Sequence, residues 1–213
     1  MRILDISQPV GSATAVWPGD LAPTLAWTLR RAAGDSVNVA ALTLSVHTGT
    51  HIDGFHHVSD EGARAAAMPL DAYIGRCTVV DARGDRALEP GHVAHLDPGG
   101  AERILFRTRE QVDETRFPDD VAHLTPELAT LLVERGVRLV GTDAPSIDPI
   151  ASKTLDAHRI LAAGGVANLE NAVLTEVPPG DYILVALPLR LVDADSSPVR
   201  AVLLAGALGE APA

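Results

Sequence analysis

The segment Val46–His57 carries side chains that could bind a metal ion. It contains four of the chain's eight histidines and one aspartate, namely His47, His51, Asp53, His56 and His57. Imidazole and carboxylate groups are the ligands that zinc and similar metals prefer. A polar loop that is rich in histidine by chance, or histidines bonded to the backbone, is the simpler alternative. The density of ligand-type side chains favours a metal site.

The spacing of these residues constrains how the chain can bring them together. His47, His51, Asp53 and His57 share the same parity, so they would point to one face of an extended segment. Such a segment would span about 20 Å from His47 to Asp53 at ~3.3 Å per residue. Bonds to zinc are only about 2.0–2.2 Å long, so the chain must bend, and Gly49 permits a bend because it can adopt positive φ. A helix is disfavoured because Gly49 and β-branched neighbours interrupt it.

The motif His47-x-Gly49-Thr50-His51-x-Asp53, followed by His57, resembles the HxGTHxDxPxH signature of the metal-dependent cyclase superfamily. Within that superfamily the chain most closely resembles the bacterial kynurenine formamidases. The likeness runs nearly end to end, through Leu4–Ser7, Val16–Asp20, Gly141–Pro149, Val177–Tyr182, Ala186–Leu191 and Ser197–Val202. Phe55 departs from the pattern, because it stands where the family usually has Pro. This leaves the shape of the adjacent pocket open, while the register to His57 is kept.

The resemblance implies two metal ions held by residues from both halves of the chain. It assigns His47, His51 and Asp53 to one ion and His158 and Glu170 to the other, with Asp53 and Glu170 shared. A carboxylate in the apolar surroundings of Glu170 is costly to bury unless it is paired or binds a cation. Five ligands are too many for one tetrahedral catalytic zinc, but they suit two metals about 3.5–4 Å apart. Ligand type alone allows zinc, manganese or cobalt.

The resemblance also implies an activity, the hydrolysis of N-formyl-L-kynurenine to L-kynurenine and formate in tryptophan degradation. A metal-bridging hydroxide would attack the formyl carbon, His57 would act in proton transfer, and Trp17 would hold the aryl ring. His56, of opposite parity, is expected to face away, and Ser146 is expected in a structural turn because no G-x-S-x-G motif surrounds it. A related hydrolase of a cyclic amide or lactone such as isatin is the alternative. A non-catalytic metal-binding protein is a further one.

Other residues that could do chemistry receive structural interpretations. The single cysteine, Cys77, lies in an apolar run and is expected to be a buried thiol. His92, His95 and His123 have no ligand-type neighbours and are expected at the surface. Trp27 follows an alternating apolar pattern and is expected in the core.

Composition indicates one soluble domain. The chain has 213 residues, 46% of them hydrophobic, so residues 1–213 can bury a substantial core as a single catalytic domain. A net charge of −11 argues against nucleic-acid and anionic-membrane partners. No apolar run approaches ~20 residues, and we expect a cytoplasmic protein with a small-molecule substrate. The resemblance implies a homodimer or a dimer of dimers.

The elements that must position these residues form a mixed α/β pattern. Strand-like runs occur at Arg2–Ile6, Thr24–Leu29, Val37–Val46, Cys77–Asp81, Arg103–Arg107, Val137–Thr142, Tyr182–Leu187 and Val199–Leu204. The clearest helix starts at Pro126 after a Thr125 cap and stops at Gly136. A second is expected over Leu155–Ala163, which would carry His158. These patterns predict a single α/β domain with a mixed sheet, and the resemblance implies the swivelling β/β/α type.

Overall fold

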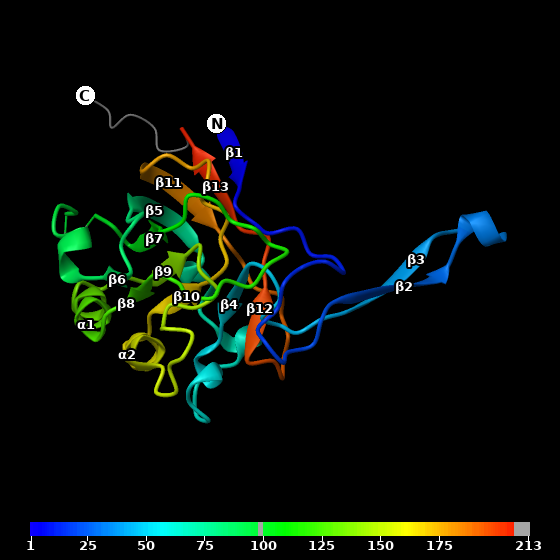
Figure 1. Ribbon diagram of the computed structural model, residues 1–213, viewed down its shortest axis with the longest axis horizontal. Helices are drawn as coiled ribbons and strands as arrows, with labels where there is room; N and C mark the ends of the chain where they lie inside the picture. Colours follow the sequence, from blue (N-terminus) through cyan, green and yellow to red (C-terminus); the bar gives the residue numbers. More distant parts are fainter. Residues whose placement is uncertain (98–99, 207–213) are drawn as a thin grey trace.

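A seven-stranded mixed sheet forms the centre of the protein (Figure 1). The computed structural model describes residues 1–97 and 100–206. The strand order is β1-β13-β11-β5-β7-β9-β10. In chain order these strands are β1 (Arg2–Asp5), β5 (Ile74–Asp81), β7 (Arg103–Arg107), β9 (Leu139–Thr142), β10 (Ala167–Leu169), β11 (Gly180–Val185) and β13 (Val202–Ala205). The predicted mixed α/β domain is therefore confirmed.

The sheet has a parallel half and an antiparallel half. Strands β5, β7, β9 and β10 run parallel to one another, whereas β11, β13 and β1 extend the sheet in antiparallel pairs. Side chains alternate between the faces, so that Leu105 belongs to one buried apolar cluster and its neighbours Ile104 and Phe106 to another. Both faces are therefore covered, as a buried parallel sheet requires.

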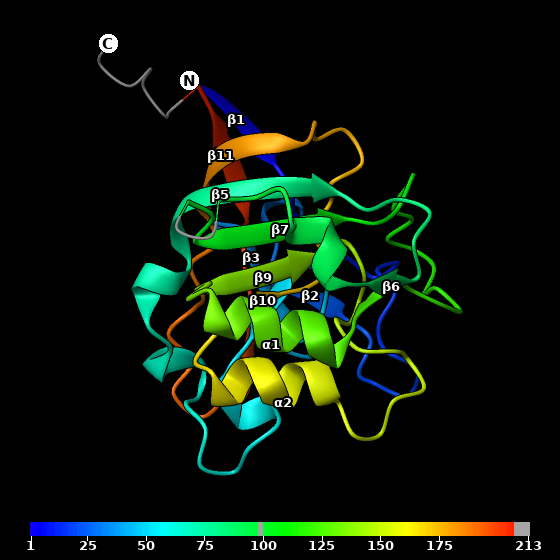
Figure 2. The ribbon, with the colours of Figure 1, turned by 90° about the vertical axis from the view of Figure 1, so that its left-hand side faces the viewer.

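Two helices cover one face. Helix α1 (Pro126–Glu134) begins where the Thr125 hydroxyl accepts a hydrogen bond from the Leu128 amide at 3.2 Å, as predicted. Helix α2 (Asp156–Ala163) lies beside it (Figure 2). Leu128 of α1 and Leu161 of α2 are buried in the cluster that includes Ile104 and Phe106. This packing holds α2, and with it His158, against the sheet.

The opposite face packs against short, irregular segments. Strand β4 (His51–Asp53) pairs antiparallel with β12 (Ser196–Pro198), and Ile52 between the two ligand-type residues enters the core cluster on that face. A second short ribbon, of β6 (Ala87–Leu88) and β8 (His123–Leu124), lies instead on the helix-covered side, because Leu88 and Leu124 belong to the cluster of Ile104 and Phe106. Short 3-10 helices occur at Arg31–Ala33, Phe55–His57, Ala65–Ala67, Leu70–Ala72 and Pro90–Val93.

A hairpin arm extends away from the body (Figure 1). It consists of β2 (Thr24–Leu29) and β3 (Val39–Thr43), and every residue of both strands is exposed. Trp27 is 47% exposed here, so the prediction that it lies in the core is wrong. Its alternating pattern does form a strand, but that strand packs on no sheet or helix among the described residues. The arm returns to the body four residues before His47.

Several further predictions can be compared with the structure. The eight strand-like runs and both helices each correspond to an observed element, with ends shifted by a few residues. Cys77 is buried, as predicted. His95 is exposed, but His92 and His123 are half-buried, because His92 caps a 3-10 helix and His123 lies in β8. Within the described ranges, no helix combines the length and apolarity needed to cross a bilayer.

Candidate metal centre

The predicted bend at Gly49 is present. Gly49 has φ +67°, and an added Cβ would meet a Val10 methyl group at 3.0 Å. The bend brings the rings of His47 and His51 to 5.0 Å between centroids. Gly49 therefore satisfies both a left-handed conformation and a close approach, which a larger residue would not.

The first half of the centre is built from this loop and β4. Asp53 Oδ1 lies 3.1 Å from His47 Nδ1 and 3.6 Å from His51 Nε2. One ligand atom from each of the three residues falls within 4.8 Å of the others. Two imidazole nitrogens and a carboxylate oxygen thus converge on one point, which is a donor set suited to zinc.

The second half comes from more than 100 residues further along the chain. His158 Nε2, on α2, lies 3.4 Å from Asp53 Oδ2 and 3.0 Å from Glu170 Oε1. Glu170 follows β10, and its Oε2 lies 3.4 Å from His51 Nε2. Asp53, His158 and Glu170 form a second group of ligand atoms within 4.8 Å. Each carboxylate therefore directs one oxygen toward each half of the centre.

The second nitrogen of each imidazole is held by an acceptor outside the cluster. His51 Nδ1 donates to the Gly49 carbonyl at 2.9 Å, and His158 Nδ1 donates to Asp148 Oδ2 at 2.6 Å. His47 Nε2 lies 2.9 Å from Asp195 Oδ2. Such outer contacts orient metal-binding histidines and set which nitrogen is free to coordinate. The nitrogens left free are the ones that face Asp53 and Glu170.

Burial makes this arrangement costly for the chain by itself. His51, Asp53, His158 and Glu170 are each at most 6% exposed. Asp53 Oδ1 is buried and accepts no hydrogen bond from the described residues. A buried carboxylate oxygen without a hydrogen bond is expensive unless a cation compensates it. The residues present therefore fit a bound metal ion.

The electrostatics support the same conclusion. Burial would raise the pKa of Asp53, but His158 and His47 outweigh it and hold that pKa well below its usual range. Burial likewise opposes a charged His47, yet the neighbouring carboxylates of Asp53 and Asp195 outweigh it and raise the pKa of His47 to about 9. Burial is also outweighed at Glu170, whose pKa the His158 and His51 imidazoles lower. The carboxylates are anionic at neutral pH, so the centre attracts cations, whether protons or metals.

The remaining histidines of the motif separate into two roles. His57 Nδ1 lies 3.1 Å from Asp195 Oδ2, and the His57 ring lies 4.6 Å from that of His47. His57 also lines a small cavity with Asp53 and His158. His56 instead donates to the Asp60 carbonyl at 3.1 Å. His57 thus lies beside the centre, whereas His56 is bonded to a separate loop carbonyl.

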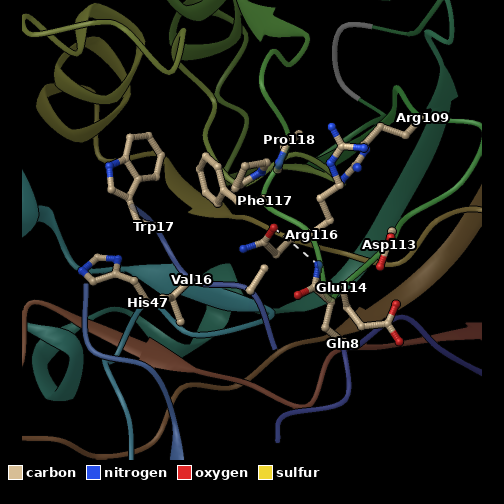
Figure 3. A pocket seen from close by; sticks show the side chains of 13 residues that line it. Gln8, Val16, Trp17, His47, Arg109, Asp113, Glu114, Arg116, Phe117 and Pro118 are labelled. Carbon is tan, nitrogen blue, oxygen red and sulfur yellow. Dashed lines mark hydrogen bonds between the residues drawn. The ribbon is translucent and has the colours of Figure 1, made fainter. Parts of the chain in front are cut away.

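A pocket adjoins His47 on the outer side (Figure 3). Trp17 and Phe117 lie together in it, with ring centroids 5.2 Å apart and planes at 74°. Arg109 and Arg116 line the same pocket (Figure 3). The pocket therefore offers apolar rings and two guanidinium groups next to the cluster of ligand atoms.

Three residues of the site were missed by the sequence analysis. Asp148, Asp195 and Asn168 hold the cluster together, and Asn168 Nδ2 donates to Asp53 Oδ2 at 2.7 Å. Asn168 lies in β10 and Glu170 directly follows that strand, and their spacing of two residues could have indicated a shared face. Asp195 contacts residues 138 and 148 positions away, and no local pattern signals that. Ser146 accepts from the Asp148 amide at 3.1 Å, as expected for a structural turn.

Sequence comparisons identify relatives over nearly the whole chain. The chain matches the family model "Putative cyclase" over residues 4–149. It is 47% identical over 206 residues to a kynurenine formamidase of Salinibacter ruber, covering 95% of this chain and 97% of that protein. It is 42% identical over 200 residues to a kynurenine formamidase of Bacillus cereus, covering 94% and 96%.

Comparisons with solved structures agree on the fold. A predicted metal-dependent hydrolase from Bacillus stearothermophilus superposes with a TM-score of 0.81 at 28% identity, covering 95% of this chain and 97% of that one. Isatin hydrolase A from Labrenzia aggregata shares the fold, with a TM-score of 0.80 at 22% identity and coverage of 95% and 93%. From its sequence and its fold together, the chain belongs to the cyclase family.

Proposed function

We propose that this protein is a metal-dependent arylformamidase that hydrolyses N-formyl-L-kynurenine to L-kynurenine and formate. The observation that carries the proposal is the buried cluster of imidazoles and carboxylates beside a pocket lined by Trp17 and Phe117. The kynurenine formamidases that resemble the chain over nearly its full length support this substrate. The proposed catalytic domain comprises residues 1–213.

The proposed ligands are the five residues that form the cluster. His47, His51 and Asp53 would hold one ion, and His158 and Glu170 the other, with both carboxylates shared. Four carboxylates lie in the cluster or contact it. Asp53 and Glu170 belong to it, Asp148 and Asp195 bond to its histidines, and the pKa of each is lowered despite its burial. Their four negative charges would be balanced by two divalent cations, for which we propose zinc, with manganese or cobalt as possible substitutes. A bound ion of this kind supplies hydroxide near neutral pH and polarises a carbonyl.

The chain's own residues would then position the substrate and move the proton. Trp17 and Phe117 would pack against the aryl ring. Arg109 would receive the carboxylate of the amino-acid group, since a guanidinium suits a carboxylate. His57, at the edge of the cluster, would deliver a proton to the departing aryl amine nitrogen.

Hydrolysis of a cyclic amide such as isatin is the second candidate. The fold shared with isatin hydrolase A is compatible with it, and Phe55 lines the cavity that also contains Asp53 and His57. Isatin carries no amino-acid carboxylate, so it would leave Arg109 unused. The pocket therefore favours the formamide over the cyclic amide.

We further propose that the protein acts in the cytoplasm as a homodimer or a dimer of dimers. The exposed side chains of the arm include Leu25, Trp27 and Leu42, which are 57%, 47% and 54% exposed. We propose that the arm packs against a second copy of this chain, because homo-oligomers are the commonest soluble assemblies.

The test of the proposed function is turnover of N-formyl-L-kynurenine by the zinc-loaded protein, followed by the absorbance of kynurenine. We expect turnover that is lost in the His51→Ala variant and after treatment with a chelator, and retained in a His95→Ala control. Isatin is assayed in parallel. No turnover of the formamide with rapid opening of isatin would overturn the substrate and favour the second candidate.

A further inference from the structure

Asp195 occupies a position between the metal cluster and the proposed proton donor. It immediately precedes β12, and its carbonyl accepts a hydrogen bond from the Gly54 amide at 2.7 Å. Ser196, the next residue, pairs with Asp53 in the β4–β12 ribbon. The backbone of Asp195 is therefore anchored next to the centre, while its side chain is only partly buried.

A single oxygen of Asp195 contacts two histidines. Oδ2 lies 2.9 Å from His47 Nε2 and 3.1 Å from His57 Nδ1. A carboxylate only accepts hydrogen bonds, so both imidazole nitrogens must carry the proton. The contact thereby holds a proton on Nε2 of His47 and on Nδ1 of His57.

Both ring nitrogens of His47 face a carboxylate oxygen, so a metal ion that takes the place of a proton on Nδ1 would leave the ring with its proton on Nε2, against Asp195. Nδ1 is the atom that lies 3.1 Å from Asp53 Oδ1, inside the first group of ligand atoms. Asp148 stands in the same relation to His158, on the other side of the cluster. Asp195 is thus the counterpart of Asp148 for the more exposed half of the centre.

For His57, the same contact leaves Nε2 as the nitrogen that exchanges a proton with a substrate. The His57 ring lies 5.9 Å from that of His158, and both line the cavity that includes Asp53. Rotation of the ring about its side-chain bonds would break the bond to Asp195. Asp195 therefore holds the ring in one orientation.

We propose that Asp195 is a positioning residue that sets the tautomers of His47 and His57 together, and so joins metal binding to proton transfer. Its effect on His57 rests on the proposed function, whereas its effect on His47 does not. Asp195 acts through the two histidines and is neither a metal ligand nor a group that touches the substrate.

The matched variants are Asp195→Asn, Asp195→Glu and, as a control, Asp193→Asn. Asn keeps the size of the side chain and the backbone bond to Gly54, but its amide can present a donor where the imidazoles need an acceptor. Asp193 is two residues away, its side chain is 94% exposed, and it lies 3.9 Å from the Arg64 guanidinium. Thermal unfolding of each variant checks that the fold is kept.

The first measurement needs no substrate. Zinc affinity is determined by competition with a chromophoric chelator, and ¹⁵N NMR of histidine-labelled, zinc-loaded protein reports which ring nitrogen of His57 is protonated. Loss of an outer contact to a metal-binding histidine typically costs ~10–100-fold in metal affinity or activity. We expect a loss of that size in Asp195→Asn, a shift of the His57 proton away from Nδ1, partial recovery in Asp195→Glu and no change in Asp193→Asn.

The second measurement tests proton delivery. Formanilide has a poor leaving group that needs a proton, whereas N-formyl-4-nitroaniline has a better one that needs it less. We expect the kcat of Asp195→Asn to fall more for formanilide than for the nitro compound, as in His57→Ala.

Three outcomes would overturn the proposal. Metal affinity and leaving-group dependence both equal to those of Asp193→Asn would leave Asp195 with no positioning role. Loss of one whole ion per chain in both Asp195 variants would make Asp195 a direct ligand. Weaker metal binding with an unchanged His57 proton would break the link between the two histidines. Wild-type protein inactive on every formamide would refute the proposed function instead, with the zinc and NMR measurements still deciding the role of Asp195.

Discussion

The metal cluster and the hairpin arm differ in which kinds of side chain they bury and which they expose. In the cluster, charged and polar residues such as Asp53 and Glu170 are almost fully buried. In the arm, large apolar residues such as Trp27 and Leu42 are about half exposed. Each region places its side chains where they are least stable in a lone chain.

The two regions differ in what would offset their unfavourable free energy. A buried carboxylate needs a positive charge at a short, directed distance, which a metal ion provides. An exposed apolar strand pair needs area removed from water, at about 25 cal/mol per Å², which another protein surface provides. The two regions are joined, because the strand β3 leads within a few residues to His47.

The largest expected effect comes from Asp53, whose carboxylate faces both halves of the cluster. We expect Asp53→Ala to lose metal from both halves and to reduce kcat well beyond the ~10–100-fold typical of outer contacts. Elemental analysis and turnover of N-formyl-L-kynurenine measure this, with His95→Ala as the control. Full metal content in Asp53→Ala would show that the cluster does not need its shared carboxylate.

The next effect concerns the arm. We expect the double variant Trp27→Asp, Leu42→Asp to shift the protein from dimer to monomer in sedimentation velocity, because two charges would have to be desolvated in the interface. Asn38→Asp adds a charge to the same arm while keeping the acceptor for the Arg31 amide, and it serves as the control. A wild-type protein that sediments as a monomer would refute the proposed role of the arm.

A smaller effect is expected in the pocket that adjoins the metal cluster at His47. A charged hydrogen bond contributes roughly 1.5–3 kcal/mol, so Arg109→Gln should lower kcat/KM for N-formyl-L-kynurenine by about 10–100-fold. Formanilide lacks the amino-acid group, so its hydrolysis should be unchanged. Equal losses on both substrates would mean that Arg109 supports the fold of the pocket and not the carboxylate.

The smallest effect is expected at Phe55, where the family usually has Pro. Phe55 is the first residue of a 3-10 helix, a position that tolerates Pro, and it is only partly buried against the core. We expect Phe55→Pro to keep its metal content and to lose about 1–2 kcal/mol of unfolding free energy, less than a fully buried Phe would. Urea unfolding of the metal-loaded protein gives the value, and a larger loss or lost metal would assign Phe55 a structural role at the centre.

Much of the fold could be predicted from the sequence because its main strands are long and apolar. The strands that the sequence did not predict are the five shortest, β4, β6, β8, β10 and β12, with two or three residues each. They form through pairing with distant segments, which no local pattern reveals. Trp27 shows the opposite failure, since its pattern identified a strand but not whether the body of the protein covers it.

The candidate site was predictable to the extent that its residues share a motif. His47, His51 and Asp53 lie in one loop, and the structure brings His158 and Glu170 to them, as the family resemblance implied. Asp148 and Asp195 were not predicted, because a carboxylate that orients a histidine carries no sequence signature. Their partners are defined only once the chain has folded.

The two halves of the centre are also joined by the main chain. The His51 amide donates to the Glu170 carbonyl at 3.2 Å, and the Glu170 amide donates to the His51 carbonyl at 3.0 Å. The spacing of these residues is therefore set by peptide groups, which neither titrate nor depend on a bound ion. The conformational entropy of bringing the ligands together is therefore lost during folding and not when the ion binds. The ion binds to ligands at a fixed spacing, so ions of different size bind with different affinity.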